Sequence, residues 1–208
     1  MVILMADIVG SSKRKGKALM ADFKVAVAWI NKMDRHHIAS PLTITLGDEF
    51  QAVVKNADGA LQIIFDLEQY LMRLRNPFKL RFIIHEGEIE TRLNRKIAYE
   101  MLGPGLTQAR DGLVALKSSR SRFKINLKDE AVSAKLTLGM IIYQGIVDRW
   151  TPAQQKVVSA FWEELSDYKK VAKRLKRDPT VMWKRKRSLM IDEINSLKKL
   201  ILLTVDSK

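Results

Sequence analysis

The hydrophobic pattern of the first half of the chain alternates between strand-like and helix-like segments. Residues 2–9 form a short apolar run that stops at a Gly-Ser-Ser sequence, and this length predicts a buried strand. Residues 17–33 and 58–74 place apolar side chains three or four positions apart, which is typical of amphipathic helices packed on a sheet. Between the two helices, residues 42–54 alternate on both sides of Gly47-Asp48, which predicts a β-hairpin with those two residues in its turn.

Two further segments complete the predicted sheet. Alternation at residues 79–84 predicts another strand, and residues 124–127 are expected to form a last one. The resulting order is strand, helix, hairpin, helix, strand. This βαββαβ order predicts an α+β fold of the ferredoxin-like type, in which an antiparallel sheet carries helices on one face.

The C-terminal part has helical spacing and clear helix-start signals. The sequence TPAQ that begins at Thr151 is a capping box, which predicts a helix from the following proline. A second helix is expected over residues 167–175, and Asp178 followed by proline marks the start of a third after a short turn. Two short helices joined by such a turn are the helix-turn-helix pattern. Val181 is expected to anchor the third helix in the core.

We therefore expect three parts in the chain. They are an α+β domain over residues 1–129, a connecting helix over residues 130–149 and an all-α helix-turn-helix module over residues 150–208. A chain of 208 residues is long enough for one domain of about 150 residues and a small module.

Composition places the protein in the cytoplasm. Hydrophobic residues make up 47% of the chain and there is no cysteine, which is ordinary for a globular protein of a reducing compartment. The N-terminus lacks the positively charged start of a secretory signal. The apolar runs are shorter than the roughly 20 residues that span a bilayer, so no membrane segment is expected.

The charge pattern indicates a polyanionic partner. The formal net charge is +14, and residues 168–187 hold ten Lys or Arg but a single acid. A basic cluster around a helix-turn-helix predicts binding to duplex DNA, with some residues in a groove and others on phosphates. The residues expected to face the groove are Thr180, Lys184 and Arg187. The residues expected to hold phosphates are Lys169, Lys170, Lys173 and Arg174.

The same segment admits other interpretations. A dimerisation helix or a docking surface for an acidic protein would have a similar composition. A membrane-surface role is disfavoured because amphipathic membrane helices carry a continuous aromatic and leucine face, whereas this basic cluster surrounds a turn. Ile194, Leu197 and Ile201 repeat at helical spacing and are a candidate homodimer seam.

Two acids stand where apolar strands end. Asp7 lies near the end of the first predicted strand, and Asp48 lies in the predicted hairpin turn. A buried carboxylate is costly unless it is paired or holds a metal, and Mg²⁺ or Mn²⁺ prefers oxygen ligands. A turn aspartate often only hydrogen-bonds its own backbone, but two such acids together favour a metal pair. Gly10 and the serines after it offer hydrogen-bond donors to an anion at a helix start.

Four motifs carry a resemblance to known families. ADIVGSS, TLGDEFQ, RFIIHEGEI and LGPGLTQAR occur in the order and at the spacing of landmark motifs of class III adenylyl and guanylyl cyclases. Residues 1–115 therefore resemble a cyclase catalytic domain remotely. Over nearly the whole chain, the motifs and the basic tail resemble the SatD family of bacterial proteins, which have a cyclase-like front and a basic tail.

The cyclase resemblance implies a site for a nucleotide triphosphate with Mg²⁺ or Mn²⁺. It assigns metal binding to Asp7 and Asp48, with the carbonyl of Ile8 as a further ligand. The residues that it assigns to the nucleotide are Gly10, Ser11, Ser12, Gly47 and the base-reading acid Glu100.

The chain also departs from the cyclase pattern at the catalytic positions. Ile44 stands where many cyclases have the lysine that reads the purine, and Thr107 replaces an asparagine. Asp111 replaces the arginine that offsets charge in the transition state, although Arg110 is one position away. Loss of one transition-state donor costs roughly 10²–10³ in rate in other enzymes, so cyclase activity is not expected.

Two functions are compatible with these patterns. The favoured one is a DNA-binding regulator whose front domain senses a nucleotide or a metal. The alternative is a divergent metal-dependent nucleotidyl cyclase or transferase whose basic tail only localises it. A regulator needs the basic helices and tolerates loss of Asp7, whereas the enzyme needs Asp7 and Asp48 and tolerates loss of the tail.

Overall fold

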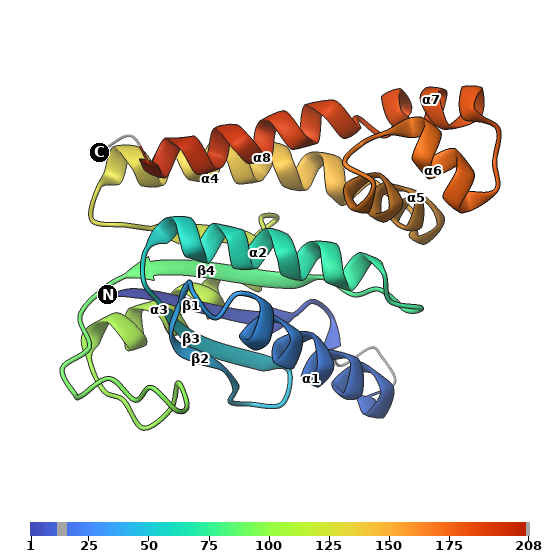
Figure 1. Cartoon of the computed structure of the whole chain (residues 1–208). Helices are drawn as coiled ribbons and strands as arrows, with labels where there is room; N and C mark the ends of the chain where they lie inside the picture. Colours follow the sequence, from blue (N-terminus) through green and yellow to red (C-terminus); the bar gives the residue numbers. More distant parts are fainter. Residues whose placement is uncertain (12–15, 207–208) are drawn as a thin grey trace.

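The computed structural model describes residues 1–11 and 16–206, which form the elements labelled in Figure 1. The strands are β1 (Val2–Ile8), β2 (Ile38–Ile44), β3 (Glu49–Val54), β4 (Leu80–Glu86) and β5 (Phe123–Asn126). The helices are α1 (Gly16–Met33), α2 (Ala57–Met72), α3 (Pro104–Leu116), α4 (Glu130–Val147), α5 (Pro152–Glu163), α6 (Tyr168–Leu175), α7 (Pro179–Ser188) and α8 (Ile191–Asp206). The elements predicted from periodicity are present, with bounds shifted by a few residues.

The sheet has the strand order β2-β3-β1-β4-β5. β1 pairs antiparallel with β3 and β4, and β2 pairs antiparallel with β3. These four strands with α1 and α2 form the ferredoxin-like βαββαβ arrangement, which confirms the predicted α+β fold class. β5 is parallel to β4 and is reached through α3, because parallel neighbours need a crossover connection.

Both faces of the sheet are covered. Successive residues of β1 point to opposite faces, so Leu4 belongs to the core under α1 and α2, and Ile3 to a second core under α3. The strand pattern had predicted helices on one face only, and α3 is the addition. Gly112 permits the close approach of α3 to β4, since a Cβ at this position would lie 2.1 Å from Cδ1 of Ile83.

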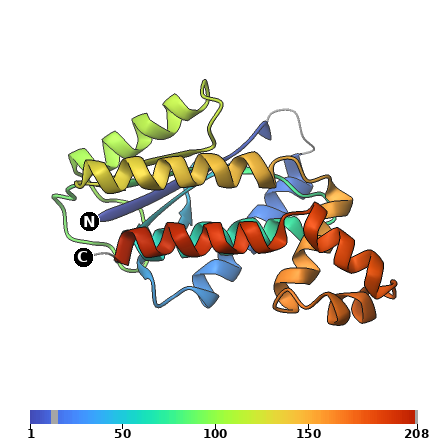
Figure 2. The ribbon, with the colours of Figure 1, turned by 90° about the horizontal axis from the view of Figure 1, so that it is seen from above.

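The C-terminal helices add a layer above α2. α4 and α8 lie side by side along the sheet, with α5, α6 and α7 gathered at one end (Figures 1 and 2). Ile194 and Ile201 of α8 are 0% and 2% exposed, and Gly139 of α4 leaves room for Ile201. These isoleucines are buried within the chain itself, so the prediction that they form a homodimer seam is wrong.

One buried cluster extends from Val2 in the sheet to Ile201 in α8. The division into parts at residues 1–129, 130–149 and 150–208 therefore stays a prediction. The longest helices, α1 and α4, have 18 residues each. Within the described residues, no helix has the combined length and apolar character needed to cross a membrane.

Candidate functional site

The end of β1 meets the turn between β2 and β3. The amide of Ile8 donates a hydrogen bond to the carbonyl of Asp48 at 3.0 Å, and Asp7 lies opposite Glu49 in the antiparallel register. Gly47 has a φ of +78°, a left-handed conformation that glycine adopts without steric cost. The structure thus brings together the backbone of the predicted metal-binding residues.

The carboxylate of Asp7 is ion-paired within the chain. The residue is 3% exposed, and Nη1 of Arg81 on β4 donates to Oδ1 and Oδ2 at 3.1 and 3.2 Å. Nζ of Lys117, just after α3, lies 3.6 Å from Oδ2. Among residues 1–11 and 16–206, no three His, Asp or Glu side chains form a group that would hold a metal. In this arrangement the acids do not fit a divalent ion, which would have to displace Arg81 and Lys117.

The turn predicted to bind phosphate follows β1. Gly10 has a φ of +67°, and both it and Ser11 are partly exposed. Ser12, the third predicted member of this turn, lies outside the described residues. The structure therefore places two of the three residues beside the end of β1.

A second ion pair lies beside Asp7 under α3. Nη2 of Arg110 is 2.9 Å from Oε1 of Glu49, and the hydroxyl of Thr45 donates to the same oxygen at 3.2 Å. Glu49 and Arg81 flank Asp7 on the two neighbouring strands, so the three charges form a row across the sheet. Arg110, one position before the expected catalytic arginine, is balanced by Glu49.

Arg110 also lines a cavity of about 380 Å³ near the start of α3. Glu100 and Thr107 line the same cavity, so the structure brings the predicted base-reading acid and the predicted asparagine position together. Glu100 has a φ of 58°, which is uncommon for a residue other than glycine. Asp111 is exposed, and Ile44 packs against the core beneath α1 and α2.

Residues 176–178 connect the short helices α6 and α7. Lys176 turns the chain in the left-handed conformation (φ 50°, ψ 53°), and Asp178 caps α7 by accepting two backbone hydrogen bonds at 2.8 and 3.2 Å. Met182 is 4% exposed, whereas Val181 is 46% exposed. The prediction that Val181 anchors α7 is wrong, because the helix presents the next residue to the core.

One face of α7 is exposed and basic. Thr180, Lys184 and Arg187 are exposed, as predicted for residues that face a groove. Trp183 is 43% exposed on the same face, and the guanidinium carbon of Arg187 lies 5.2 Å from its ring centroid. Sequence reasoning missed Trp183, because an aromatic residue in a helix is usually part of the core.

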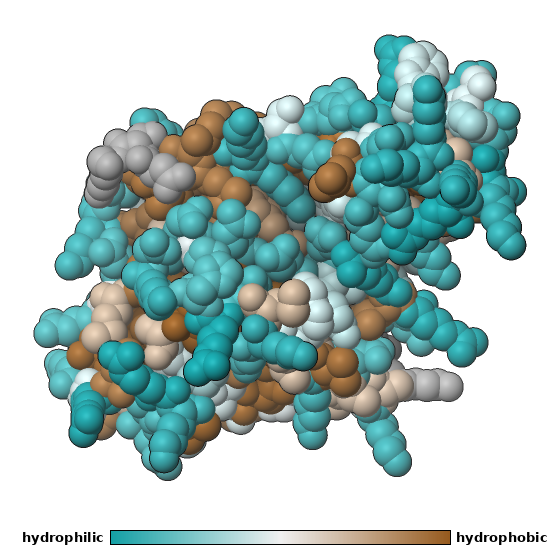
Figure 3. Space-filling view, in the orientation of Figure 1, coloured by the Kyte–Doolittle hydropathy of each residue, from teal (hydrophilic) through white to brown (hydrophobic). Residues whose placement is uncertain are grey.

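The four side chains of α6 that are predicted to bind phosphate differ in their contacts. Lys169, Lys170 and Lys173 are exposed, in a region where hydrophilic side chains cover the surface at the upper right of Figure 3. Arg174 instead forms ion pairs with Glu163 and Glu164, the latter at 3.2 Å from Nη1. Arg174 thus ties α6 to the end of α5, and the three lysines are the better candidates.

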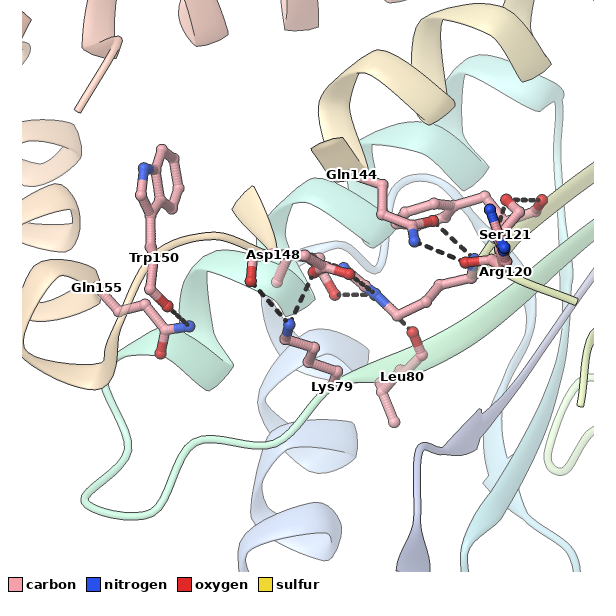
Figure 4. A network of polar contacts seen from close by, with 11 residues as sticks. Lys79, Leu80, Arg120, Ser121, Gln144, Asp148, Trp150 and Gln155 are labelled. Carbon is pink, nitrogen blue, oxygen red and sulfur yellow. Dashed lines mark hydrogen bonds and ion pairs between the residues drawn. The ribbon is translucent and has the colours of Figure 1, made fainter. Parts of the chain in front are cut away.

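A buried arginine that sequence reasoning did not single out joins the sheet to the C-terminal helices. Arg122 is 6% exposed and donates to both carboxylate oxygens of Glu68 on α2 and of Asp148 after α4, at 2.8 to 3.1 Å. Burial alone would lower the pKa of Arg122, but the two carboxylates raise it above its usual range. Lys79 reaches the same Asp148 at 3.1 Å (Figure 4). The network fixes the end of α4 against the sheet.

Comparison with known protein families identifies the family of this chain. The model of the SatD family matches residues 1–195, from β1 into α8. The chain belongs to the SatD family. This membership confirms the resemblance carried by the four motifs and the basic tail.

Two solved structures similar to this SatD family member are cyclases. One is a bacterial light-regulated adenylyl cyclase, with 15% sequence identity and a TM-score of 0.44, covering 60% of this chain and 73% of that chain. The other is the catalytic core of a rhodopsin-guanylyl cyclase with converted specificity in complex with ATPαS, with 15% identity and a TM-score of 0.43. This second match covers 60% of this chain and 75% of the guanylyl cyclase chain. None of the curated proteins matches the sequence.

Proposed function

We propose that this protein is a cytoplasmic DNA-binding regulator in which α6 and α7 act as a helix-turn-helix. The observation that carries the proposal is the exposed face of α7, where Thr180, Trp183, Lys184 and Arg187 lie together. In a helix-turn-helix the second helix enters the major groove and its exposed side chains reach base edges. Arginine and lysine pair with guanine there, and a threonine hydroxyl or methyl contacts several bases.

The first helix of the pair supplies the backbone contacts in this proposal. Lys169, Lys170 and Lys173 of α6 are exposed beside α7, and ammonium groups bind phosphate without reading sequence. The net charge of +14 adds long-range attraction to DNA. The position of α5, α6 and α7 at one end of the molecule leaves α7 accessible to a duplex (Figure 2).

We also propose that the α+β domain predicted over residues 1–129 senses a nucleotide. The observation that favours this second role is the cavity of about 380 Å³ that Glu100, Thr107 and Arg110 line together. Its volume is within the range of small-molecule sites, and a carboxylate beside a hydroxyl suits the amino and ring nitrogen groups of a base. The proposal concerns the nucleotide alone, because Asp7 is engaged by Arg81 and Lys117.

The enzymatic alternative, a divergent nucleotidyl cyclase or transferase, has less support. A transition state for cyclisation needs a free cation near the phosphorus oxygens. Arg110 is balanced by Glu49, and the expected arginine position holds the exposed acid Asp111. We therefore place nucleotide binding ahead of nucleotide chemistry.

Fluorescence anisotropy with a labelled duplex tests the DNA-binding proposal. The Lys184→Ala/Arg187→Ala double variant should bind its preferred sequence at least about tenfold more weakly, because base contacts discriminate by roughly 1–3 kcal/mol each. Lys24→Ala/Lys32→Ala removes the same charge from two exposed positions of α1 and is the matched control. Equal losses in the two double variants would show that α7 has no special part in binding.

A further inference from the structure

A groove of about 580 Å³ lies between α5, α7 and the turn before α7. Val157, Leu175, Val181 and Met182 form most of its apolar wall. Val181 is 46% exposed there, so an aliphatic side chain faces open space between two helices. A volume of this size is within the roughly 300–1,000 Å³ of small-molecule sites.

The rim of this groove is positively charged. Arg177 of the turn and Arg185 of α7 line it, and no acidic residue from the described part of the chain does. Both arginines are exposed, and neither has an ion pair among the described residues, in contrast to Arg174 with its two glutamates. Thr151 and Gln154, which also line the groove, are uncharged and bond to each other in the capping box of α5.

The groove lies on another side of α7 from the face proposed to meet DNA. At 3.6 residues per turn, the mean direction of positions 181, 182 and 185 is about 140° away from the mean direction of positions 180, 184 and 187. Val181 is about 60° from Lys184, whereas Arg185 points about 100° away from Lys184 and about 160° away from Arg187. A ligand in the groove and a duplex on α7 would not compete for the same side chains.

We propose that this groove binds a small carboxylic acid with an apolar body. The two guanidinium groups would hold the carboxylate, since arginine pairs with a carboxylate through two parallel hydrogen bonds. The apolar body would cover Val157, Val181 and Met182, which removes their surface from water. Charge complementarity selects the anion, and the aliphatic wall selects an apolar body over a strongly hydrated one.

The test uses two fluorescent probes on the full chain without DNA. The probe 8-anilinonaphthalene-1-sulfonate is an apolar anion whose sulfonate stands in for the carboxylate, and N-phenyl-1-naphthylamine is its neutral counterpart. Arg177→Ala/Arg185→Ala should weaken binding of the anionic probe about tenfold or more and leave the neutral probe unchanged. Lys184→Ala/Arg187→Ala removes equal charge from the other side of α7 and should change both affinities by less than about threefold. Decanoate below its micelle concentration should displace the anionic probe from the wild type.

A second variant tests the same proposal independently, in case Arg177→Ala/Arg185→Ala misfolds. Val181→Asp places a carboxylate in the groove at a half-exposed position, so the helical circular dichroism should persist while binding of the anionic probe is lost. Three results would overturn the proposal: equal losses in both double variants, no displacement by decanoate, or full probe binding by folded Val181→Asp. Because DNA is absent from these measurements, they succeed or fail independently of the DNA-binding proposal.

Discussion

The guanidinium of Arg81 contacts both carboxylate oxygens of Asp7, at 3.1 and 3.2 Å, across two neighbouring strands of the sheet. Asp7 is 3% exposed, and Lys117 adds a second cation at 3.6 Å. The negative charge at the end of β1 is therefore balanced by the protein itself. This balance links the stability of the fold to the identity of residue 7.

Asp7→Asn is expected to destabilise the protein by about 2–4 kcal/mol, because it leaves two cations beside a buried amide. Urea unfolding of the variant measures the change in the free energy of unfolding. Glu90→Gln, at an exposed position of the loop before α3, is the control and should change it little. An empty metal site would behave in the opposite manner, since removing one carboxylate would relieve repulsion and stabilise the fold.

Manganese should bind weakly to the protein without a nucleotide. The ion has to displace Arg81 and Lys117 from Asp7, and the neighbouring Glu49 is already paired with Arg110. ATP or GTP should tighten the binding, because the phosphate oxygens of a bound nucleotide would themselves hold the ion. Calorimetry with and without nucleotide measures both affinities. Tight binding of manganese alone contradicts this expectation, and binding that persists in Asp7→Asn and Asp48→Asn would exclude both carboxylates as ligands.

Arg122→Met is expected to lower the free energy of unfolding by about 3–5 kcal/mol, since it leaves Glu68 buried without a partner. Arg122→Lys should also destabilise, because one ammonium cannot replace the planar fork that meets two carboxylates. Arg73→Ala removes a more exposed ion pair with Glu163 and serves as the comparison. Thermal or urea unfolding separates the cases, and a loss as small as that of Arg73→Ala would contradict the role of Arg122.

The stability of the fold should depend on Asp34 in a defined pH window. Burial raises the pKa of Asp34 from 3.8 to about 6, with Asp66 adding to the rise and His36 opposing it. The folded state therefore holds this proton more tightly, and the stability that it contributes below pH 3.8 is lost as the pH rises through about 6. Asp34→Asn should match the wild type near pH 4 and exceed it by about 1–2 kcal/mol near pH 7, after allowance for solvent screening. An equal difference at every pH in urea unfolding would contradict this assignment.

The elements of the fold were predictable because each has a local signature. The apolar strand that ends at Gly10, the Gly47-Asp48 turn and the cap at Asp178 follow from short-range rules of spacing and hydrogen bonding. The rotation of α7 about its own axis was not predictable, since Val181 and Met182 are adjacent apolar residues in a short helix. Only packing against α6 and α8 decides which of the two is buried.

The ion pairs were less predictable, because their partners are distant in sequence. Asp7 and Arg81 are 74 residues apart, and Glu68 and Arg122 are 54 residues apart. One signal was present in the sequence. Glu68 lies on the apolar stripe of α2, three residues before Leu71, where an unpaired acid would be costly. A buried cation was therefore required, although nothing local identified it as Arg122.

The salt dependence of DNA binding by the full-length protein tests the central claim most directly. Anisotropy over a salt series should give a linear fall of log K with log salt concentration, with a slope of about −0.9 for each phosphate that the protein neutralises. Lys169→Ala/Lys170→Ala/Lys173→Ala should weaken binding to all sequences alike and make that slope shallower by about 0.9 for each phosphate that is no longer neutralised. Absence of binding at low salt, in a sample shown to be folded by circular dichroism, would contradict the claim that this protein is a DNA-binding regulator.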